Sequence, residues 1–163
     1  MKTKRPSNED KPRGESILGL GGTVGTVVNH FGFHVKDIKA SVAKWQAAGL
    51  MIEPGNNGRA DQAWLNTPDG ARIEILEDKA IAEPIRMHHI HWNVAAVPEM
   101  QAWYAKHFGA IPGKRGQFDA ADLPGVNLTF GKVDTANVGT RGRALDHIGF
   151  EIRNLPQFIA RLE

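Results

Sequence analysis

The chain contains three segments that begin alike: HFGFHV from His30, HIHWNV from His89 and HIGFEI from His147. Their starting points lie 59 and 58 residues apart, and in each an aliphatic residue follows the leading histidine by five positions. Self-similarity at a fixed period indicates a repeated supersecondary unit. A position suited to start a helix follows each segment. The sequence therefore predicts a strand that runs into a helix, repeated three times, with a histidine at the head of each strand.

Alternation gives these histidines a direction, because successive side chains of a strand point to opposite faces of its sheet. In the first copy, Phe31, Phe33 and Val35 share one face, and His30 and His34 share the other. The second and third copies alternate in the same way, with apolar residues opposite the leading histidine. Each strand is therefore predicted to bury an apolar face and to present imidazole on the other.

The composition of the chain is that of a packed domain without cysteine. The 163 residues are 41% hydrophobic, which suffices for the core of one domain or slightly more. The absence of cysteine excludes disulfides, thiolate metal sites and cysteine nucleophiles. No apolar run approaches the ~20 residues that span a bilayer. The net charge of +2 arises in the first 14 residues, and no basic face is interleaved with aromatic residues. We therefore expect a cytoplasmic protein that binds neither nucleic acid nor a membrane.

Periodicity along the first unit predicts a strand, a helix and three further strands. The predicted elements are a strand over 27–35, a helix capped by Asp37 with the apolar stripe Ile38, Val42 and Trp45, and strands over 51–53, 62–65 and 72–76. The second unit repeats the opening strand from about Met87, with a helix over 98–108 and a strand over 126–130. The third unit reaches its helix near Leu155 and stops before any return strands.

These patterns divide the chain into four parts. They are a disordered basic tail and lead-in (1–26), a first βαβββ module (27–77), a second βαβββ module (86–132) and the start of a third, truncated module (144–163). The predicted fold class is α+β, built from repeated βαβββ modules. A sheet that lacks return strands has unpaired edges, and such edges recruit partners. We therefore expect that chains associate as homo-oligomers through these edges.

Glu74 is the candidate partner of His30. It lies on the strand that closes the first unit, on the face opposite Ile73 and Ile75. If that strand pairs beside the opening strand, the two side chains point into the same space. Two or three imidazoles with one carboxylate form an open site for Fe, Mn, Ni or Zn. We predict metal ligation by His30 and Glu74, with Glu74 also able to act as a base, and expect His34, His88 and His91 to flank the site or face solvent.

These residues and motifs resemble the vicinal oxygen chelate superfamily, which includes glyoxalase I, extradiol dioxygenases, and fosfomycin and bleomycin resistance proteins. The resemblance covers about residues 27–163 and rests on VNHFGFHVKD, TPDGARIEILED, HHIHWNV, LPGVNLTF and LDHIGFEIRNL. It implies that two βαβββ modules pair around a metal-binding cleft. It also implies that the opening histidine and closing glutamate of a module are ligands, which identifies His30, Glu74, His89 and His147. The second unit departs from this pattern, because its closing NLTFGKV has no glutamate.

Two pairings of the modules stay open at this point. In one, the first unit belongs to a different domain from the other two, which gives partial sites His30 with Glu74 and His89 with His147. In the other, the first two units pair with each other and supply His30, Glu74 and His89. The expected function is a metal-dependent enzyme acting on a small oxygen-chelating substrate, as a glyoxalase-like lyase or isomerase or as an extradiol-type dioxygenase. The alternatives are a metal-free protein that sequesters a small molecule, and an inactive fragment of a longer protein.

Overall fold

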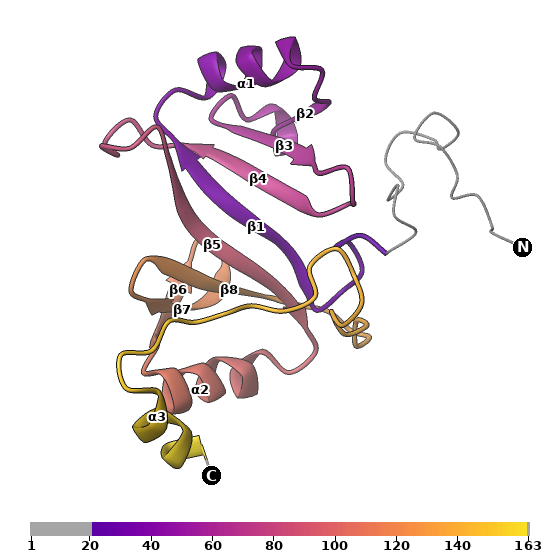
Figure 1. Ribbon diagram of the computed structural model, residues 1–163. Coiled ribbons are helices and arrows are strands. Elements are labelled where there is room, and N and C mark those ends of the chain that lie inside the picture. Colours follow the sequence, from indigo (N-terminus) through magenta and orange to yellow (C-terminus); the bar gives the residue numbers. More distant parts are fainter. Residues whose placement is uncertain (1–20, 163) are drawn as a thin grey trace, which may run out of the picture.

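The computed structural model describes residues 21–162, so the basic tail over 1–20 lies outside the described residues (Figure 1). Its first half runs β1 (Val28–Val35), α1 (Ile38–Ala47), β2 (Ile52–Pro54), a 3₁₀ turn (Asn56–Gly58), β3 (Gln62–Asn66) and β4 (Arg72–Glu77). Its second half runs β5 (Ile85–Val94), α2 (Val97–Phe108), β6 (Ile111–Arg115), β7 (Phe118–Leu123) and β8 (Val126–Lys132). The helix α3 (Leu155–Leu162) follows. The predicted α+β class is confirmed.

The strands of both halves join in one sheet, in the order β2-β3-β4-β1-β5-β8-β7-β6. In each half the opening strand pairs in parallel with the closing strand, β1 with β4 and β5 with β8. The two opening strands pair antiparallel at the centre, with His30 opposite His91 and Gly32 opposite His89. The structure therefore adopts the arrangement in which the first two units pair. β2 and β6 form the sheet edges, and association of chains through them stays a prediction.

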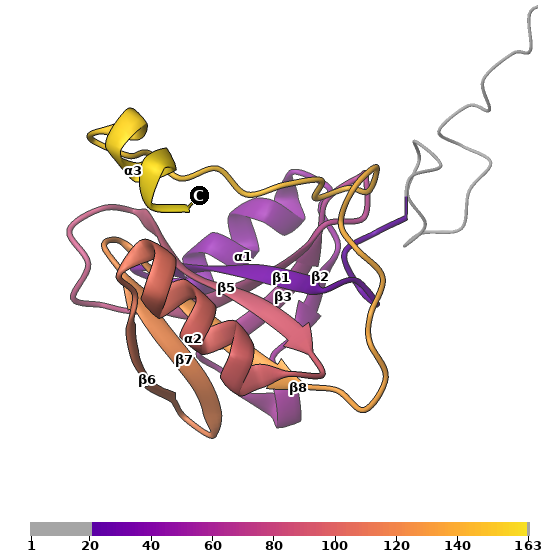
Figure 2. The ribbon, with the colours of Figure 1, turned by 90° about the horizontal axis from the view of Figure 1, so that it is seen from below.

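Each half has its own hydrophobic core under its own helix. Below α1, the core contains Val35, Ile38 and Ile75, with Phe33 and Trp45 packed against it. The predicted apolar face is therefore correct: Val35 and Ile75 are fully buried, each 1% exposed, while Phe33 and Trp45 are half-buried. The predicted cap is also present, since the Asp37 carboxylate accepts a hydrogen bond from the backbone of residue 40 at 2.9 Å. Figures 1 and 2 show α1 and α2 at opposite ends of the sheet.

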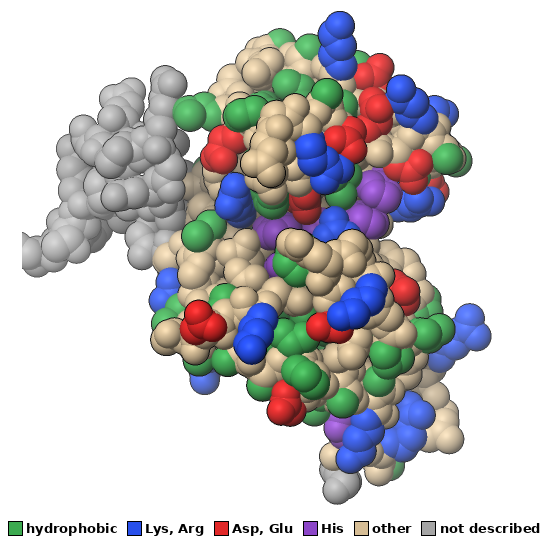
Figure 3. All heavy atoms as spheres, turned by 180° about the vertical axis from the view of Figure 1, so that it is seen from behind, with side chains coloured by type: hydrophobic (Ala, Val, Ile, Leu, Met, Phe, Trp, Pro, Cys, Tyr) green, Lys and Arg blue, Asp and Glu red, His purple; other side chains and the backbone are tan. Residues whose placement is uncertain are grey.

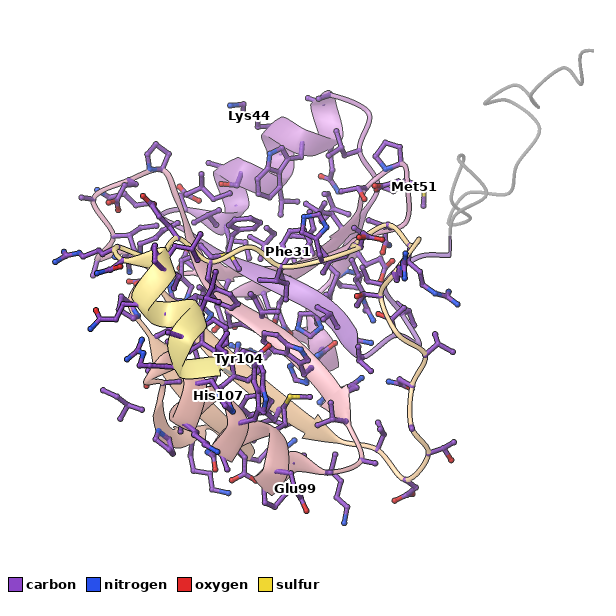
Figure 4. The ribbon with its side chains drawn as sticks, turned by 60° about the horizontal axis from the view of Figure 1, so that its bottom comes forward. Phe31, Lys44, Met51, Glu99, Tyr104 and His107 are labelled. Atoms are coloured by element: carbon purple, nitrogen blue, oxygen red, sulfur yellow. The ribbon has the colours of Figure 1, made fainter. Side chains whose placement is uncertain are left out.

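The third copy of the repeat is not a strand, which corrects the sequence-based expectation. Residues 144–152 form no sheet pairing and cross the central strands as an extended strap, close to Phe31 (Figure 4). The strap packs its apolar residues against the second core, and the ring of Phe150 lies 4.8 Å from that of Phe108. The physical reason is pairing, because β4 and β5 already occupy both sides of β1. The alternating apolar residues of this segment pack against the second core, but the segment does not join the sheet.

Two further expectations need correction. Residues 21–26, expected to belong to the disordered lead-in, pack against the sheet, with Thr23 and Thr26 each 1% exposed. Their hydroxyls satisfy backbone groups: Thr23 Oγ1 accepts from the backbone of Arg72 at 2.9 Å, and Thr26 Oγ1 donates to the carbonyl of Val28 at 2.7 Å. The predicted βαβββ pattern of the second module implied the strands β6 and β7 without giving their bounds, because IPGKR has no apolar alternation to locate the first of them. Within residues 21–162, no helix has the length and apolarity needed to cross a membrane.

Candidate metal centre

Three side chains from three neighbouring strands meet at the centre of the sheet. His30 Nε2 lies 3.3 Å from Glu74 Oε2, His89 Nε2 lies 3.0 Å from the same oxygen, and the two nitrogens are 3.2 Å apart. All three residues are buried, with exposures of 6%, 5% and 0% for His30, Glu74 and His89. The predicted convergence of His30 and Glu74 on one face is therefore confirmed, and the central pairing adds His89. These three residues are called the triad below.

Neighbouring side chains orient the two imidazoles of the triad. His30 Nδ1 lies 2.8 Å from the amide oxygen of Asn29, which can only accept, so Nδ1 carries the proton and Nε2 offers a lone pair. His89 Nδ1 lies 3.0 Å from His88 Nδ1, and a proton on His89 Nε2 can donate to Glu74 Oε2, 3.0 Å away. If His89 passes that proton on and donates from Nδ1 to His88 instead, two lone pairs and one carboxylate oxygen surround a buried space that a cation can occupy.

The spacing of these three atoms suits a divalent metal ion. Ligands about 2.1 Å from a metal and at right angles to each other lie about 3 Å apart. The three observed separations, 3.0, 3.2 and 3.3 Å, agree with that value. Imidazole nitrogen and carboxylate oxygen are also ligands that Fe, Mn, Ni and Zn accept. The residues present therefore fit the metal that the sequence led us to expect.

Burial and contacts set the charge state that a metal requires. Burial by itself raises the pKa of Glu74, but its contacts with His30, His89 and Gln62 outweigh that effect and hold the pKa well below its usual range. Burial lowers the pKa of His30 and of His89, and the attraction of Glu74 does not reverse it. At neutral pH the imidazoles are therefore neutral and the carboxylate is charged. Gln62 also donates a hydrogen bond to Glu74 Oε1, so Oε2 is the oxygen turned to the histidines.

His91 lies closer to the triad than the sequence indicated. A ligand atom of His91 lies within 4.8 Å of those of His30 and His89. Its ring stacks on that of His30, with centroids 4.6 Å apart and planes at 28°. Burial, followed by repulsion from the other two histidines, lowers the pKa of His91 to about 3. The sequence could have predicted this position, because His91 lies two residues after His89 on the same strand and therefore faces the same side of the sheet.

Gly32 is a second residue of the site that sequence reasoning missed. It lies between His30 and His34 on β1, directly opposite His89 on β5. A Cβ atom at this position would lie 2.1 Å from Cε1 of the His89 ring. The absence of a side chain at Gly32 therefore makes the room that His89 occupies. The repeat itself hides this function, because the corresponding position in the second copy holds His91.

His147 is the predicted site residue that the structure does not bring to the triad. Its side chain is 84% exposed, and its Nδ1 lies 3.1 Å from the carboxylate of Asp146. The expectation rested on strand alternation, and no strand forms at His147. The other flanking histidines do lie near the site: His34 stacks on His88 with centroids 3.9 Å apart, and His88 contacts His89 as described.

Two members of the triad, His30 and Glu74, line a cavity of about 440 Å³. The aromatic residues Trp64 and Phe118 and the arginines Arg59 and Arg115 also line it. Figure 3 shows histidines and charged residues gathered in the hollow between the two halves of the molecule. The cavity is on the face opposite the strap. It is large enough to enclose a small molecule beside the triad.

Comparison with known proteins identifies the fold through solved structures. No protein-family model and no curated protein sequence matches the chain. Glyoxalase I from Zea mays superposes with a TM-score of 0.52 and 17% identity, over 66% of this chain and 43% of that one. Catechol 2,3-dioxygenase matches with a TM-score of 0.46 and 18% identity, over 83% and 54%. Methylmalonyl-CoA epimerase from Mycobacterium tuberculosis matches with a TM-score of 0.44 and 14% identity, over 65% and 90%. This chain spans less than half the length of the maize structure.

Proposed function

Since the chain has the vicinal oxygen chelate fold, we propose that it is a metal-dependent enzyme that binds two neighbouring oxygen atoms of a small substrate. The observation that supports this most is the triad, in which three buried atoms of metal-ligand type meet within 3.3 Å of one another. A protein rarely buries such a set without a cation to compensate it. The triad residues His30, Glu74 and His89 would hold the metal. The metal would act as a Lewis acid on the oxygens of the substrate.

Oxygenation is the reaction class that the triad favours. Two imidazoles and one carboxylate on one side of a metal, with the remaining positions open, are typical of non-haem Fe(II) oxygenases. A dioxygenase that acts on a substrate with two neighbouring oxygens, of which the extradiol type is one kind, is therefore the first candidate. A glyoxalase-like isomerase is the second, in which Glu74 would leave the metal, lose the contacts that lower its pKa, and then take a proton from a carbon next to a carbonyl.

The residues around the triad have separable tasks under either reaction. Asn29 and His88 hold the two imidazoles in the tautomer that offers Nε2, and Gln62 fixes the carboxylate rotation of Glu74. Trp64 is buried against His30, with ring centroids 4.8 Å apart, and excludes water from that side. This precise support reduces the reorganisation that binding of a metal and substrate requires.

Titration with Ni(II) or Fe(II) under anaerobic conditions tests the proposal. We expect about one metal per chain in the wild type and a loss of tight binding in His30→Ala and in His89→Ala. His147→Ala is the matched control, because His147 is an exposed member of the same repeat, and it should bind metal like the wild type. If the wild type binds no metal, the protein is a sequestering module or a fragment. If His147→Ala loses metal as His89→Ala does, the proposed triad is wrong.

A further inference from the structure

Arg115 is a partly buried cation next to the triad, at the end of β6. Its side chain is 23% exposed, and Nη2 lies 3.7 Å from Glu74 Oε2. Within residues 21–162 this is the ion pair that Arg115 makes, and at this length it is weaker than a hydrogen-bonded pair. Burial lowers the pKa of Arg115 from its ordinary value, although a guanidinium keeps its proton in proteins. Its charge is therefore only partly compensated.

Arg59, the other arginine at the same cavity, is fully compensated by comparison. Its Nε and Nη2 donate to the two oxygens of Asp61 at 3.0 and 2.7 Å, which is the two-pronged geometry of a strong pair. Its side chain is 51% exposed, so water also solvates the charge. The structure thus places two arginines at one cavity and leaves one of them, Arg115, in need of an anion.

A metal in the triad would increase that need. Glu74 would then compensate the metal, and Arg115 would lose its counter-charge. Asp61 balances Arg59, and Glu74 is the carboxylate that faces Arg115, so a metal ion bound by Glu74 would give the cavity excess positive charge at Arg115. A partly buried guanidinium beside an open metal position suits a planar anion that can accept from its fork.

We propose that Arg115 recognises a carboxylate of the substrate, and that the substrate is a small 2-oxo or 2-hydroxy carboxylate. Because Arg115 lies 3.7 Å from Glu74, a carboxylate bound to it would lie directly beside the oxygens that the metal holds, which a small acid allows. The cavity of about 440 Å³ accommodates such an acid with a modest side chain. This inference rests on the proposed function, because it needs a metal in the triad.

Two probes that differ in the carboxylate test the inference. Pyruvate is the simplest 2-oxo carboxylate, and catechol has two neighbouring oxygens without a carboxylate. Their affinities for the Ni(II)-loaded protein are measured by calorimetry in the wild type, in Arg115→Gln and in the matched control Arg59→Gln. Arg115→Gln removes charge-assisted hydrogen bonds to the carboxylate, so the affinity for pyruvate should fall about 10- to 100-fold. Catechol should change less than about threefold, and Arg59→Gln should leave both probes within that range.

The outcomes separate this inference from the proposed function. Arg115→Gln should bind Ni(II) at least as tightly as the wild type, since a neighbouring cation has been removed, and this shows that the triad is intact. Arg115→Lys keeps the charge without the fork and should recover only part of the pyruvate affinity. Unchanged pyruvate affinity in Arg115→Gln, or an equal loss for catechol, overturns the inference alone. Failure of the wild type to bind Ni(II) overturns the proposed function and this inference with it.

Discussion

The two halves of the molecule have the same order of elements and the same strand pairing, but they differ where the metal would bind. In the first half, Gly32 pairs across the opening and closing strands with Glu74. In the second half, the corresponding pair is His91 with Thr129. His30 and His89 occupy equivalent positions in the two opening strands, since each lies opposite the other strand's Gly32 or His91. Both halves therefore supply a histidine, and only the first supplies a carboxylate.

The two halves also differ in the strand next to the closing strand, which is β3 in the first half and β7 in the second. Trp64 and Gln62 on β3 contact His30 and Glu74, and the polar side chain of Gln62 holds the carboxylate. On the other side, the ring of Phe118 packs edge-on against His91, 5.0 Å between centroids. The first half has thus kept the polar surroundings that an ionised carboxylate needs, while the second half has filled the same region with rings. The site is asymmetric although the backbone is nearly symmetric.

The largest loss of metal affinity is expected at Glu74, the carboxylate that the second half lacks. Glu74→Gln removes the only carboxylate of the triad and leaves two imidazoles, so Ni(II) affinity should fall by more than about 100-fold in a calorimetric titration. The matched change in the second half is Thr129→Val, which alters a buried side chain whose hydroxyl donates to Asn127 at 2.7 Å. It should cost about 1 kcal/mol in unfolding free energy and leave Ni(II) affinity within threefold. Equal losses of metal in both variants would contradict the assigned asymmetry.

Glycine substitutions test how each half makes room for its neighbour. A Cβ at Gly32 would lie 2.1 Å from the His89 ring, whereas a Cβ at Gly131 would lie 2.7 Å from Asn93 Oδ1 and 2.9 Å from His91 Nε2. Both alanine variants should lose about 1–3 kcal/mol of stability through overpacking, measured by urea unfolding. Only Gly32→Ala displaces a triad residue, so it should also weaken Ni(II) binding, by about tenfold or more. If Gly131→Ala weakens the metal equally, His91 is a ligand in its own right.

Acid should lower the unfolding free energy of the metal-free protein. In the second half, the residue responsible is His91. The pKa of His91 is about 3 in the folded state, below its value of about 6.5 in the unfolded chain. Between these values the unfolded chain binds more protons, so stability falls as the pH decreases from 6.5 towards 3, by at most about 1.4 kcal/mol per pH unit for this group. In the presence of a chelator, His91→Phe should show a shallower decrease of unfolding free energy than the wild type. His147→Phe, which changes an exposed histidine, should follow the wild-type curve.

The sequence predicted the convergence of His30 and Glu74 on one face, and strand parity is the physical reason. His30, Glu74 and His89 lie on strands with clear alternation, and the parity of a strand decides which face a side chain takes. Alternation does not reveal which strands become neighbours, so both module pairings stayed open until β1 was seen beside β5. The same limit explains His147, whose segment alternates correctly and still pairs with no strand. The sequences of β6 and β7 have no apolar alternation from which their bounds could be predicted. Gly32 has no side chain, so its role in making room for His89 could not be inferred from its residue type.

Two substitutions would give the second half the residue pair of the first. Thr129→Glu alone places a charge in a fully buried position opposite the His91 ring, and we expect it to lose about 1–3 kcal/mol of stability without better metal binding. Adding His91→Gly reproduces the Gly32 and Glu74 pair, because the glycine opens the space that the new carboxylate needs. The register relates Glu74 to Thr129 as it relates His30 to His89, so the new oxygen should reach the triad.

The double variant His91→Gly with Thr129→Glu should therefore bind Ni(II) about 10-fold more tightly than His91→Gly alone, which is about 1.4 kcal/mol. The effect of the two changes should be strongly non-additive, since the residues share one space. Titration of the wild type, both single variants and the double variant forms a complete cycle. Equal Ni(II) affinity in the double variant and in His91→Gly would mean that the two halves are not equivalent at the metal. The asymmetry would then arise in the backbone, and the two side-chain differences would be its consequence.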